Sequence, residues 1–312
     1  MLDFTQFLIG LLQAAVIVLL APLFSGLARV LRAKLHSRRG PGLLQNYRDI
    51  VKLLKRQDVR PAAAGWIFQA TPLVWMGCML LIAVLIPIFS RQPPLGSIGD
   101  LIAVVYLFAL ARFFFALAGV DSSNSFAGLG ANREMTLAVL VEPVMMLALF
   151  VVALLAGSTH LGVIGEAVAG GGITAQAALW LGALAFVVAA FVEAGKLPYD
   201  LAEAEQELQE GPLAEYSGPA LALLKWGLAM KQLLIVALGL AVFLPFGSPA
   251  AFSPATLPLA LALFVLKALA LYSLAAVVEN GMARVRFRMA PNAIWVAFGM
   301  ALLSFVFYLA QV

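Results

Sequence analysis

Eight ionisable side chains lie within or at the ends of long apolar stretches, where they could take up and pass on protons. They are Arg112, Glu134, Glu142, Glu193, Lys225, Lys231, Lys267 and Glu279. Because a charge in hydrocarbon is costly, such residues usually face a water-filled or protein-lined path. Counting along the stretches places Lys231 and Lys267 near the middle of a membrane and the other six nearer one side. This distribution predicts a proton half-channel that ends at mid-membrane. For Arg112 and Lys225, a snorkelling or structural role is the alternative.

A second group of carboxylates crowds the segment 193–216, which holds seven of the sixteen acidic residues. Besides Glu193 they are Asp200, Glu203, Glu205, Glu207, Glu210 and Glu215. Asp200 followed by Glu203 resembles a capping box, and Gly211-Pro212 would end the helix that it starts. Four carboxylates recur three or four residues apart, along one helical face: Asp200, Glu203, Glu207 and Glu210. Such a row, with raised and coupled pKa values, could exchange protons near neutral pH, and a solvated acidic face is the alternative.

The elements that must position these groups are membrane-spanning helices. The chain has 312 residues, of which 63% are hydrophobic and 12% charged, with a mean hydropathy of +1.00. Lipid must therefore be its solvent, and we predict one all-α membrane domain over residues 1–312. Apolar runs of about twenty residues predict eight spans, at 4–28, 66–89, 98–119, 133–156, 177–195, 220–245, 255–280 and 291–310.

Basic residues predict the orientation of these spans. Ten of the twenty Lys and Arg residues lie in the loop 29–65. With the N-terminus outside, the inner loops hold these ten, Lys196 and three more at 284–288, whereas the outer loops hold Arg91 alone. This is the positive-inside pattern, and it explains the sequence pI of 9.3 without nucleic acid. The acidic loop, 193–219, is then cytoplasmic.

The basic loop 29–65 also contains a predicted amphipathic helix. After Gly40-Pro41-Gly42, apolar residues recur at helical spacing from Leu43 to Leu54, while basic residues occupy the other faces. Such a helix can rest on anionic headgroups or dock onto a soluble partner. For docking, the candidate residues are Arg38, Arg39, Arg48 and Lys52.

Metal chemistry is not expected in this chain. Cys78 is the single cysteine and lies in an apolar stretch, and the two histidines, His36 and His160, fall in different loops. A cysteine-ligated cluster is therefore excluded. Any redox metal in the same assembly would belong to another polypeptide, and we assign no catalytic residue.

Several of these segments resemble a known family, the membrane subunit of respiratory complex I that contributes to its quinone site, with its relatives in group 4 nickel-iron hydrogenases. The likeness covers nearly the whole chain and is carried by Arg38-Arg39-Gly40-Pro41, Leu43-Leu44-Gln45, residues 49–52, Glu142 and the loop 193–218. The loop is most similar to the formate hydrogenlyase branch. That branch has a GK-hydrophobic-P-aromatic-D start and a LAEAEQELQEGPL-x-EYSG run, found here at 195–200 and 201–218. The segment 112–134 resembles the same branch.

The resemblance implies an eight-helix, non-catalytic subunit of a bacterial cytoplasmic membrane complex that oxidises formate and evolves hydrogen. Its implied partners are hydrogenase large and small subunits, an iron-sulfur protein, antiporter-like membrane subunits and a formate dehydrogenase, with membrane lipid around them. The nickel-iron centre and iron-sulfur clusters would lie in those partners. The acidic loop would face the cluster-bearing and catalytic subunits, and the buried charges would connect that junction to the proton path of an antiporter-like neighbour.

Two other functions remain open at this point. A complex I-type quinone reductase subunit would admit a quinone between the first and sixth spans, but complex I members usually have Asn-Arg where Gly195 and Lys196 stand. A stand-alone ion or solute transporter would fit the half-channel. It would leave the acidic loop and the basic helix without partners, and no inverted repeat supports it.

Overall fold

The computed structural model describes residues 4–202 and 204–310, with the side chains of Ser97, Glu205 and Gln206 excepted. The α-helices are α1 (Phe4–Leu35), α2 (Gln45–Leu54), α3 (Trp66–Leu85), α4 (Leu101–Asp121), α5 (Ser125–Ala156), α6 (Leu161–Ala169), α7 (Ala177–Glu193), α8 (Glu205–Leu208), α9 (Gly218–Phe243), α10 (Leu257–Gly281) and α11 (Ala290–Leu309). Short 3-10 helices occupy Gly96–Ile98, Gly211–Leu213 and Phe287–Met289.

The all-α membrane fold is confirmed. Each of the eight predicted spans coincides with one of the helices α1, α3, α4, α5, α7, α9, α10 and α11. In the described part of the chain, seven helices are long and apolar enough to cross a membrane, and the eighth, α7, is apolar but has only 17 residues. The predicted amphipathic helix is α2, which begins at Gln45 rather than Leu43.

Two spans are longer than predicted. Helices α1 and α5 have 32 residues each, which is about 48 Å and exceeds a hydrocarbon core of about 30 Å. Helix α5 starts at Ser125 because the side chain of Asn124 accepts hydrogen bonds from the backbone N–H groups of Phe126 and Ala127. The nine-residue helix α6 was not predicted, since its apolar run is too short to span.

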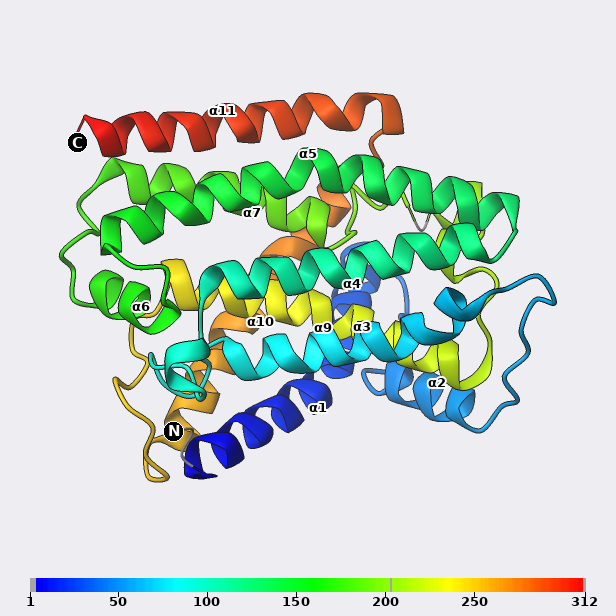
Figure 1. The fold of residues 1–312 in the computed structure, drawn as a ribbon, viewed down its shortest axis with the longest axis horizontal. Coiled ribbons are helices and arrows are strands. Elements are labelled where there is room, and N and C mark those ends of the chain that lie inside the picture. The colour runs from blue at the N-terminus through cyan, green and yellow to red at the C-terminus, as the bar shows by residue number, and fades with distance from the viewer. Residues whose placement is uncertain (1–3, 203, 311–312) are drawn as a thin grey trace.

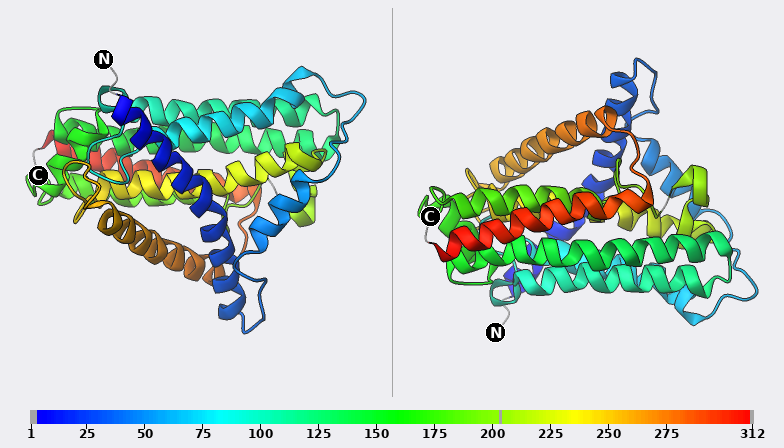
Figure 2. Two further views of the ribbon diagram at one scale, coloured as in Figure 1. Left: turned by 90° about the horizontal axis from the view of Figure 1, so that it is seen from below. Right: turned by 90° about the horizontal axis from the view of Figure 1, so that it is seen from above.

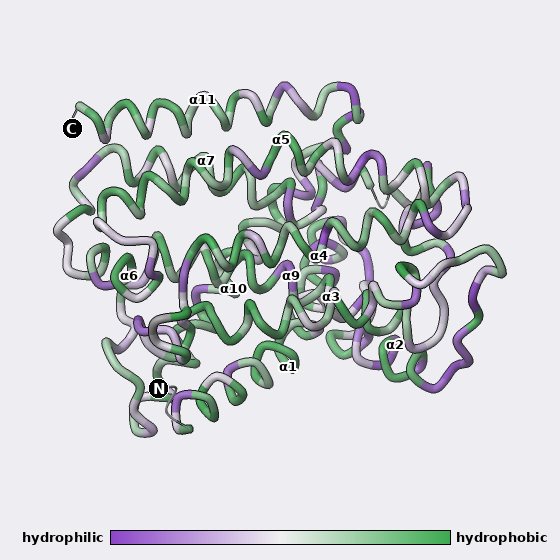
Figure 3. The backbone as a smooth tube through the Cα atoms, in the orientation of Figure 1, coloured by the Kyte–Doolittle hydropathy of each residue, from purple (hydrophilic) through white to green (hydrophobic). Residues whose placement is uncertain are grey.

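Helix α9 lies at the centre of the bundle and is the most buried of the candidate spans. It contacts α1, α2, α3, α7 and α10, while α5 contacts α4, α7 and α11 (Figure 1). Helix α11 covers one edge of this layered arrangement, and α1 crosses the opposite edge obliquely (Figure 1). Hydrophobic residues follow the spans, and hydrophilic residues gather around α2 and the neighbouring loops (Figure 3).

Prolines inside two spans leave a backbone carbonyl group without its helical hydrogen-bond donor, and side chains from other elements donate to these carbonyls. Pro22 in α1 has no N–H, so the carbonyl of Val18 lacks its helical donor, and Trp226 Nε1 of α9 donates to it at 2.9 Å. The carbonyl of Pro22 itself accepts from Asn46 of α2 at 3.3 Å. These bonds hold α2 and α9 against α1.

Pro72 acts in the same way in α3. It frees the carbonyl of Phe68, which accepts a hydrogen bond from Tyr216 Oη at 2.8 Å, and the two rings stack with centroids 3.9 Å apart. Burial raises the pKa of Tyr216 far above its ordinary value, so the hydroxyl keeps its proton. The acidic loop is thereby anchored, at its end, to α3.

Gly227 allows α9 to approach α3 one turn before Lys231. A methyl group there would lie 2.2 Å from Cδ1 of Trp75, whose side chain is buried. We expect Gly227→Ala to lower the free energy of unfolding by about 1–3 kcal/mol, because the helices must separate. Gly77→Ala in α3 is the matched control, since its new methyl meets no atom within 4 Å and alanine favours helix. Denaturation of the purified protein in detergent measures both, and equal stabilities would contradict this account.

Candidate functional site

Five of the eight predicted ionisable residues meet in one buried cluster. This central charge cluster consists of Arg112 on α4, Glu134 and Glu142 on α5, Glu193 at the end of α7, and Lys231 on α9. Four helices thus bring residues from positions 112–231 into contact. The structure places these five side chains together, and their role in proton transfer stays a prediction.

Arg112 is the centre of the cluster. Its Nε lies 3.2 Å from Glu134 Oε1, its Nη1 donates to Glu142 Oε1 at 3.0 Å, and its Nη2 contacts Glu193 Oε2. The guanidinium presents donors in a planar fork, which is why one arginine can bind three carboxylates at once. Its side chain is only 4% exposed.

Lys231 closes the cluster from the α9 side. Its Nζ lies 3.0 Å from Glu193 Oε1 and 3.9 Å from Glu134 Oε1. It also stands over the ring of Trp75, 5.7 Å from the ring centroid, a favourable position for a desolvated cation. Glu193 therefore lies between two cations, and none of its side chain is exposed.

The cluster has more acidic than basic groups. Two cations face three carboxylates, so one bound proton would make it neutral. Glu142 differs from the other members because about a third of its side chain is exposed on the flank of the bundle. Because a charged side chain in hydrocarbon is costly, the exposed part of Glu142 must face protein or water rather than lipid.

A small cavity of about 20 Å³ adjoins Glu134, Glu193 and Lys231, which is room for about one water molecule. A larger cavity of about 440 Å³, which we call the polar cavity, lies between α1, α2, α9 and the acidic loop. Gly195 and Asp200 line both cavities. The central charge cluster therefore adjoins a space that opens at the predicted cytoplasmic end.

Glu279 forms a separate buried site. Its Oε2 lies 3.1 Å from Arg32 Nη1 and its Oε1 lies 3.3 Å from Lys196 Nζ, and 1% of its side chain is exposed. Lys196 also stands 5.6 Å above the ring of Tyr272. Burial lowers the pKa of Lys196 from its ordinary value, with Glu279 opposing the shift. Arg32, which we counted only as an orientation signal, is thus a partner of this site.

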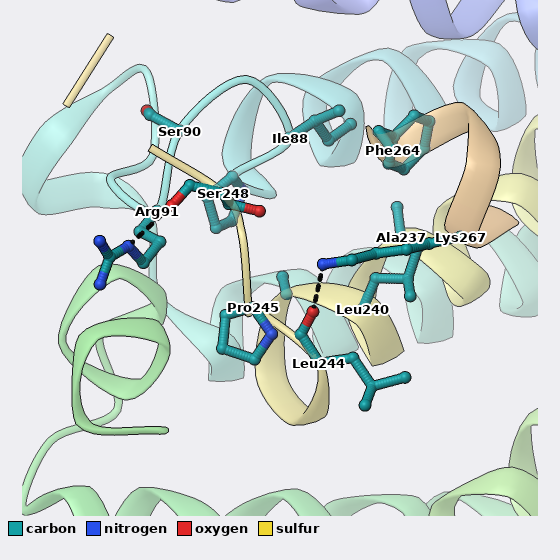
Figure 4. Close-up of a pocket in the computed structure, with 12 residues that line it drawn as sticks. Ile88, Ser90, Arg91, Ala237, Leu240, Leu244, Pro245, Ser248, Phe264 and Lys267 are labelled. Atoms are coloured by element: carbon teal, nitrogen blue, oxygen red, sulfur yellow. Dashed lines mark hydrogen bonds between the residues drawn. The ribbon is translucent and has the colours of Figure 1, made fainter. Parts of the chain in front are cut away.

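The remaining two predicted path residues lie elsewhere. Lys225 Nζ binds Glu210 Oε1 of the acidic loop at 3.1 Å, and more than a third of each side chain is exposed. Lys267 lies near the middle of α10 and outside the central charge cluster, and its predicted mid-membrane position stays a prediction. Its Nζ donates to the carbonyl of Leu244 at 2.8 Å (Figure 4). It also donates to the carbonyl of Phe246 at 2.5 Å, so it binds just beyond the end of α9 that is opposite the acidic loop. The long lysine side chain reaches free carbonyls at a helix C-terminus, where a cation is favoured.

The predicted carboxylate stripe is wrong. The segment forms only the four-residue helix α8, and Gln209 and Glu210 adopt left-handed conformations with φ of +49° and +69°. A row of like charges would repel, whereas the irregular loop buries Leu201, Leu208 and Leu213 against the bundle. Glu203 lies outside the described residues, and Glu205 begins α8.

Four carboxylates of the loop instead have separate partners on the same chain. Asp200 Oδ2 lies 2.7 Å from Arg284 Nη2, Glu207 Oε2 lies 2.7 Å from Arg133 Nη1, Glu210 binds Lys225, and Asn124 donates to Glu215. The hydrogen bond and charge of Arg133 hold the pKa of Glu207 below its usual value, which is opposite to the raised values predicted for the row.

The predicted basic docking residues all lie on the surface. None of Arg38, Arg39, Arg48 and Lys52 is buried. Sequence reasoning missed Arg133, Arg284, Asn124 and Trp75, because nothing in the local pattern shows which distant residue completes an ion pair. Within residues 4–202 and 204–310, no group of three or more His, Cys, Asp or Glu side chains could hold a metal ion.

Comparisons with known proteins agree with this architecture. Residues 8–309 match the family model described as NADH dehydrogenase. The chain is 49% identical over 300 residues to formate hydrogenlyase subunit 4 of Escherichia coli K12, covering 96% of this chain and 98% of that protein. Hydrogenase-4 component C of the same organism is also 49% identical, with 96% and 95% covered.

More distant relatives include a subunit of the NADH-quinone oxidoreductase of Methylococcus capsulatus, which is 35% identical over 80% of this chain and 78% of that protein. Among solved structures, a chain of the membrane-bound sulfane sulfur reductase, an archaeal respiratory membrane complex, has the same fold. It has a TM-score of 0.85 at 24% identity, with 97% and 99% of the two chains covered. The chain is thus a multi-pass inner-membrane subunit of a respiratory-type complex, and it belongs to the NADH dehydrogenase family that includes formate hydrogenlyase subunit 4 and hydrogenase-4 component C.

Proposed function

We propose that this chain is the membrane-anchor and proton-coupling subunit of a formate hydrogenlyase-type complex, in which formate oxidation drives hydrogen evolution in partner subunits. The high identity to formate hydrogenlyase subunit 4 over nearly both full lengths supports the type of complex. The central charge cluster supports proton coupling. Ionisable residues inside a membrane are costly, and a subunit that only anchored soluble partners would not need five of them between its spans. The nickel-iron centre and iron-sulfur clusters would lie in the partner subunits.

The cluster can hold a proton because its three carboxylates face only two cations. A proton entering from the polar cavity would reach Glu134 or Glu193 by way of the water-sized cavity. Arg112 contacts Glu134, Glu142 and Glu193 together, so neutralising one carboxylate changes the electrostatic potential at the other two. Glu142, at the flank of the bundle, is the member from which a proton can pass sideways to a neighbouring antiporter-like subunit.

Two variants test the proton path. We expect Glu142→Gln and Lys231→Met to leave assembly and hydrogen evolution largely intact while lowering proton movement across vesicles about tenfold or more. The measurement is the change in internal pH of vesicles that contain the complex, after formate is added. Arg133→Met on α5 is the matched control, because Arg133 pairs with the exposed Glu207 and lines neither the polar cavity nor the water-sized cavity. Normal proton movement in both cluster variants would rule out the proposed path.

Docking of the peripheral arm is the second part of the proposal. Four carboxylates of the acidic loop are already paired within the chain, so this loop has less free charge with which to bind a partner. The exposed basic residues of the loop 29–65 would instead bind acidic surfaces of the iron-sulfur subunits. We expect Arg38→Glu with Arg39→Glu to reduce co-purification of hydrogenase subunits several-fold at about 0.15 M salt. The charge-preserving pair Arg38→Lys with Arg39→Lys should retain them. Equal recovery from both double variants would exclude an electrostatic dock here.

A complex I-type quinone reductase subunit is the second candidate, and the position of the polar cavity favours it. This cavity lies between α1 and α9, where a quinone headgroup would enter. Its lining opposes that use, since the described residues around it include charged groups from every side: Arg29, Arg32, Asp49, Lys52, Lys196, Asp200, Glu210, Lys225 and Glu279. Isolation from the native membrane decides between the two. Co-isolated hydrogenase and iron-sulfur subunits support the first candidate, and a flavin-bearing NADH module supports the second.

A further inference from the structure

An apolar groove of about 230 Å³ runs along the flank of the bundle, between α7 and α10, with α9 as its floor. Helix α10 leans away from the rest of the bundle (Figure 2). The residues that form the groove include Phe186, Ala190, Val236, Gly239 and Leu271. Gly239 sets the depth of the floor, because a methyl group there would lie 2.9 Å from Cε1 of Phe186. In a membrane, an apolar space that opens sideways is filled by hydrocarbon, since an unfilled groove loses its dispersion contacts.

The length of the groove fits a lipid chain. On α7 it extends from Trp180 to Ala194, which is about 21 Å at the rise of an α-helix. One leaflet of the hydrocarbon core is about 15 Å deep, half of about 30 Å. A volume of 230 Å³ over about 21 Å is a mean cross-section of about 11 Å², which is room for part of the width of one extended chain that lies in the open groove, but not for a transmembrane helix about 10 Å wide.

The polar end of the groove fits an anionic headgroup. Lys196 and Gln232 line both the groove and the polar cavity, so the two spaces meet there. Lys196 and Arg32 share the single carboxylate of Glu279, and Arg29 lies close enough to act on the charge of Lys196. The described lining of the polar cavity holds five cations (Arg29, Arg32, Lys52, Lys196 and Lys225) and four carboxylates (Asp49, Asp200, Glu210 and Glu279), which leaves a net charge of +1. Lys196 follows the last residue of α7 by three positions, at the predicted cytoplasmic end of this helix.

We propose that this groove binds an anionic phospholipid of the predicted cytoplasmic leaflet, with one acyl chain between α7 and α10 and the phosphate at Lys196. The headgroup extends into the polar cavity, where Arg29 and Arg32 face it. The lipid fills the space between α7 and α10 and thereby fixes α10, which carries Glu279, against α9. Basic residues next to the cytoplasmic surface select anionic over zwitterionic lipid in this way.

Native mass spectrometry of the intact complex, extracted in mild detergent, tests the chain site. We expect one phosphatidylglycerol or cardiolipin to remain on the wild-type chain, and Ala190→Phe to lower its occupancy about tenfold by filling the groove. Leu184→Phe on the same helix is the matched control, because Leu184 is exposed beside the groove rather than within it. Equal lipid retention by the two variants would overturn the proposal.

The headgroup site is tested with the double variant Lys196→Met with Glu279→Gln, which removes one charge of each sign. Added phosphatidylglycerol should bind the wild type about tenfold more tightly than phosphatidylethanolamine, and the double variant should lose most of this preference. Equal binding of both lipids to the wild type would overturn the assignment, as would recovery of an isoprenoid quinone in place of phospholipid. Efficient crosslinking of a groove-lining Val187→Cys to another membrane subunit would also overturn it, because a protein would then occupy the groove.

Discussion

Arg112→Met should cost about 3–5 kcal/mol of folding free energy and greatly reduce the amount of assembled complex, because it leaves three carboxylates without their shared cation. Glu134, Glu142 and Glu193 all bind Arg112, and only Lys231 would remain to compensate Glu134 and Glu193. The methionine fills a similar volume, so lost packing contributes little. Denaturation of the purified chain in detergent, together with the yield of complex from membranes, measures the effect.

Arg133→Met is the control for this prediction. Arg133 lies on the neighbouring α5 and pairs with Glu207, whose side chain is 56% exposed. Exposed pairs of this kind contribute about 0–1 kcal/mol. A second variant, Arg112→Met with Glu142→Gln, removes one of the stranded charges and should recover part of the loss. If Arg112→Met were no more destabilising than Arg133→Met, the cluster would not be a coupled ionic unit.

The spans could be predicted from sequence because hydrocarbon permits few choices. Eight apolar runs of the right length must become helices, since every backbone polar group has to be bonded within its own segment. The ends of those helices were harder to predict. Helix α5 begins eight residues before the predicted span, at a capping Asn124 that hydropathy does not detect. The orientation, with the N-terminus outside, stays a prediction from the basic residues.

The site was predicted in part for the same reason. An ionisable residue in an apolar run is conspicuous, so Arg112, Glu134, Glu142, Glu193 and Lys231 were all found. Their pairing was not, because it depends on how four helices pack. Lys267 shows the limit of counting along a span, because counting does not show that its flexible side chain reaches carbonyls beyond the end of α9. The acidic loop shows another limit, because helical spacing predicts a stripe only where the backbone is helical.

Glu279→Gln should be the second severe substitution, with a loss of about 3–5 kcal/mol near neutral pH. The carboxylate is almost fully buried and is the shared partner of Arg32 and Lys196. A third of the Arg32 side chain is exposed, so this residue can turn toward water. Lys196 has less freedom to do so, since 14% of its side chain is exposed and it lies against Tyr272. The variant therefore strands a buried ammonium group.

The pH dependence of this loss identifies Lys196 as the cause. Burial already lowers the pKa of Lys196 in the folded protein, and Glu279 opposes that shift, so Glu279→Gln lowers the pKa further. Between the folded pKa and the ordinary value of about 10.4, the unfolded chain binds more protons than the folded one, so stability rises with pH in this window. We expect the deficit of Glu279→Gln to shrink as pH rises from about 7 toward about 10. In the double variant with Lys196→Met, the deficit should be smaller near neutral pH and should lose this dependence. Unfolding curves of the wild type, Glu279→Gln and the double variant at several pH values measure both effects. A deficit that stays constant with pH would assign the cost to Arg32 instead.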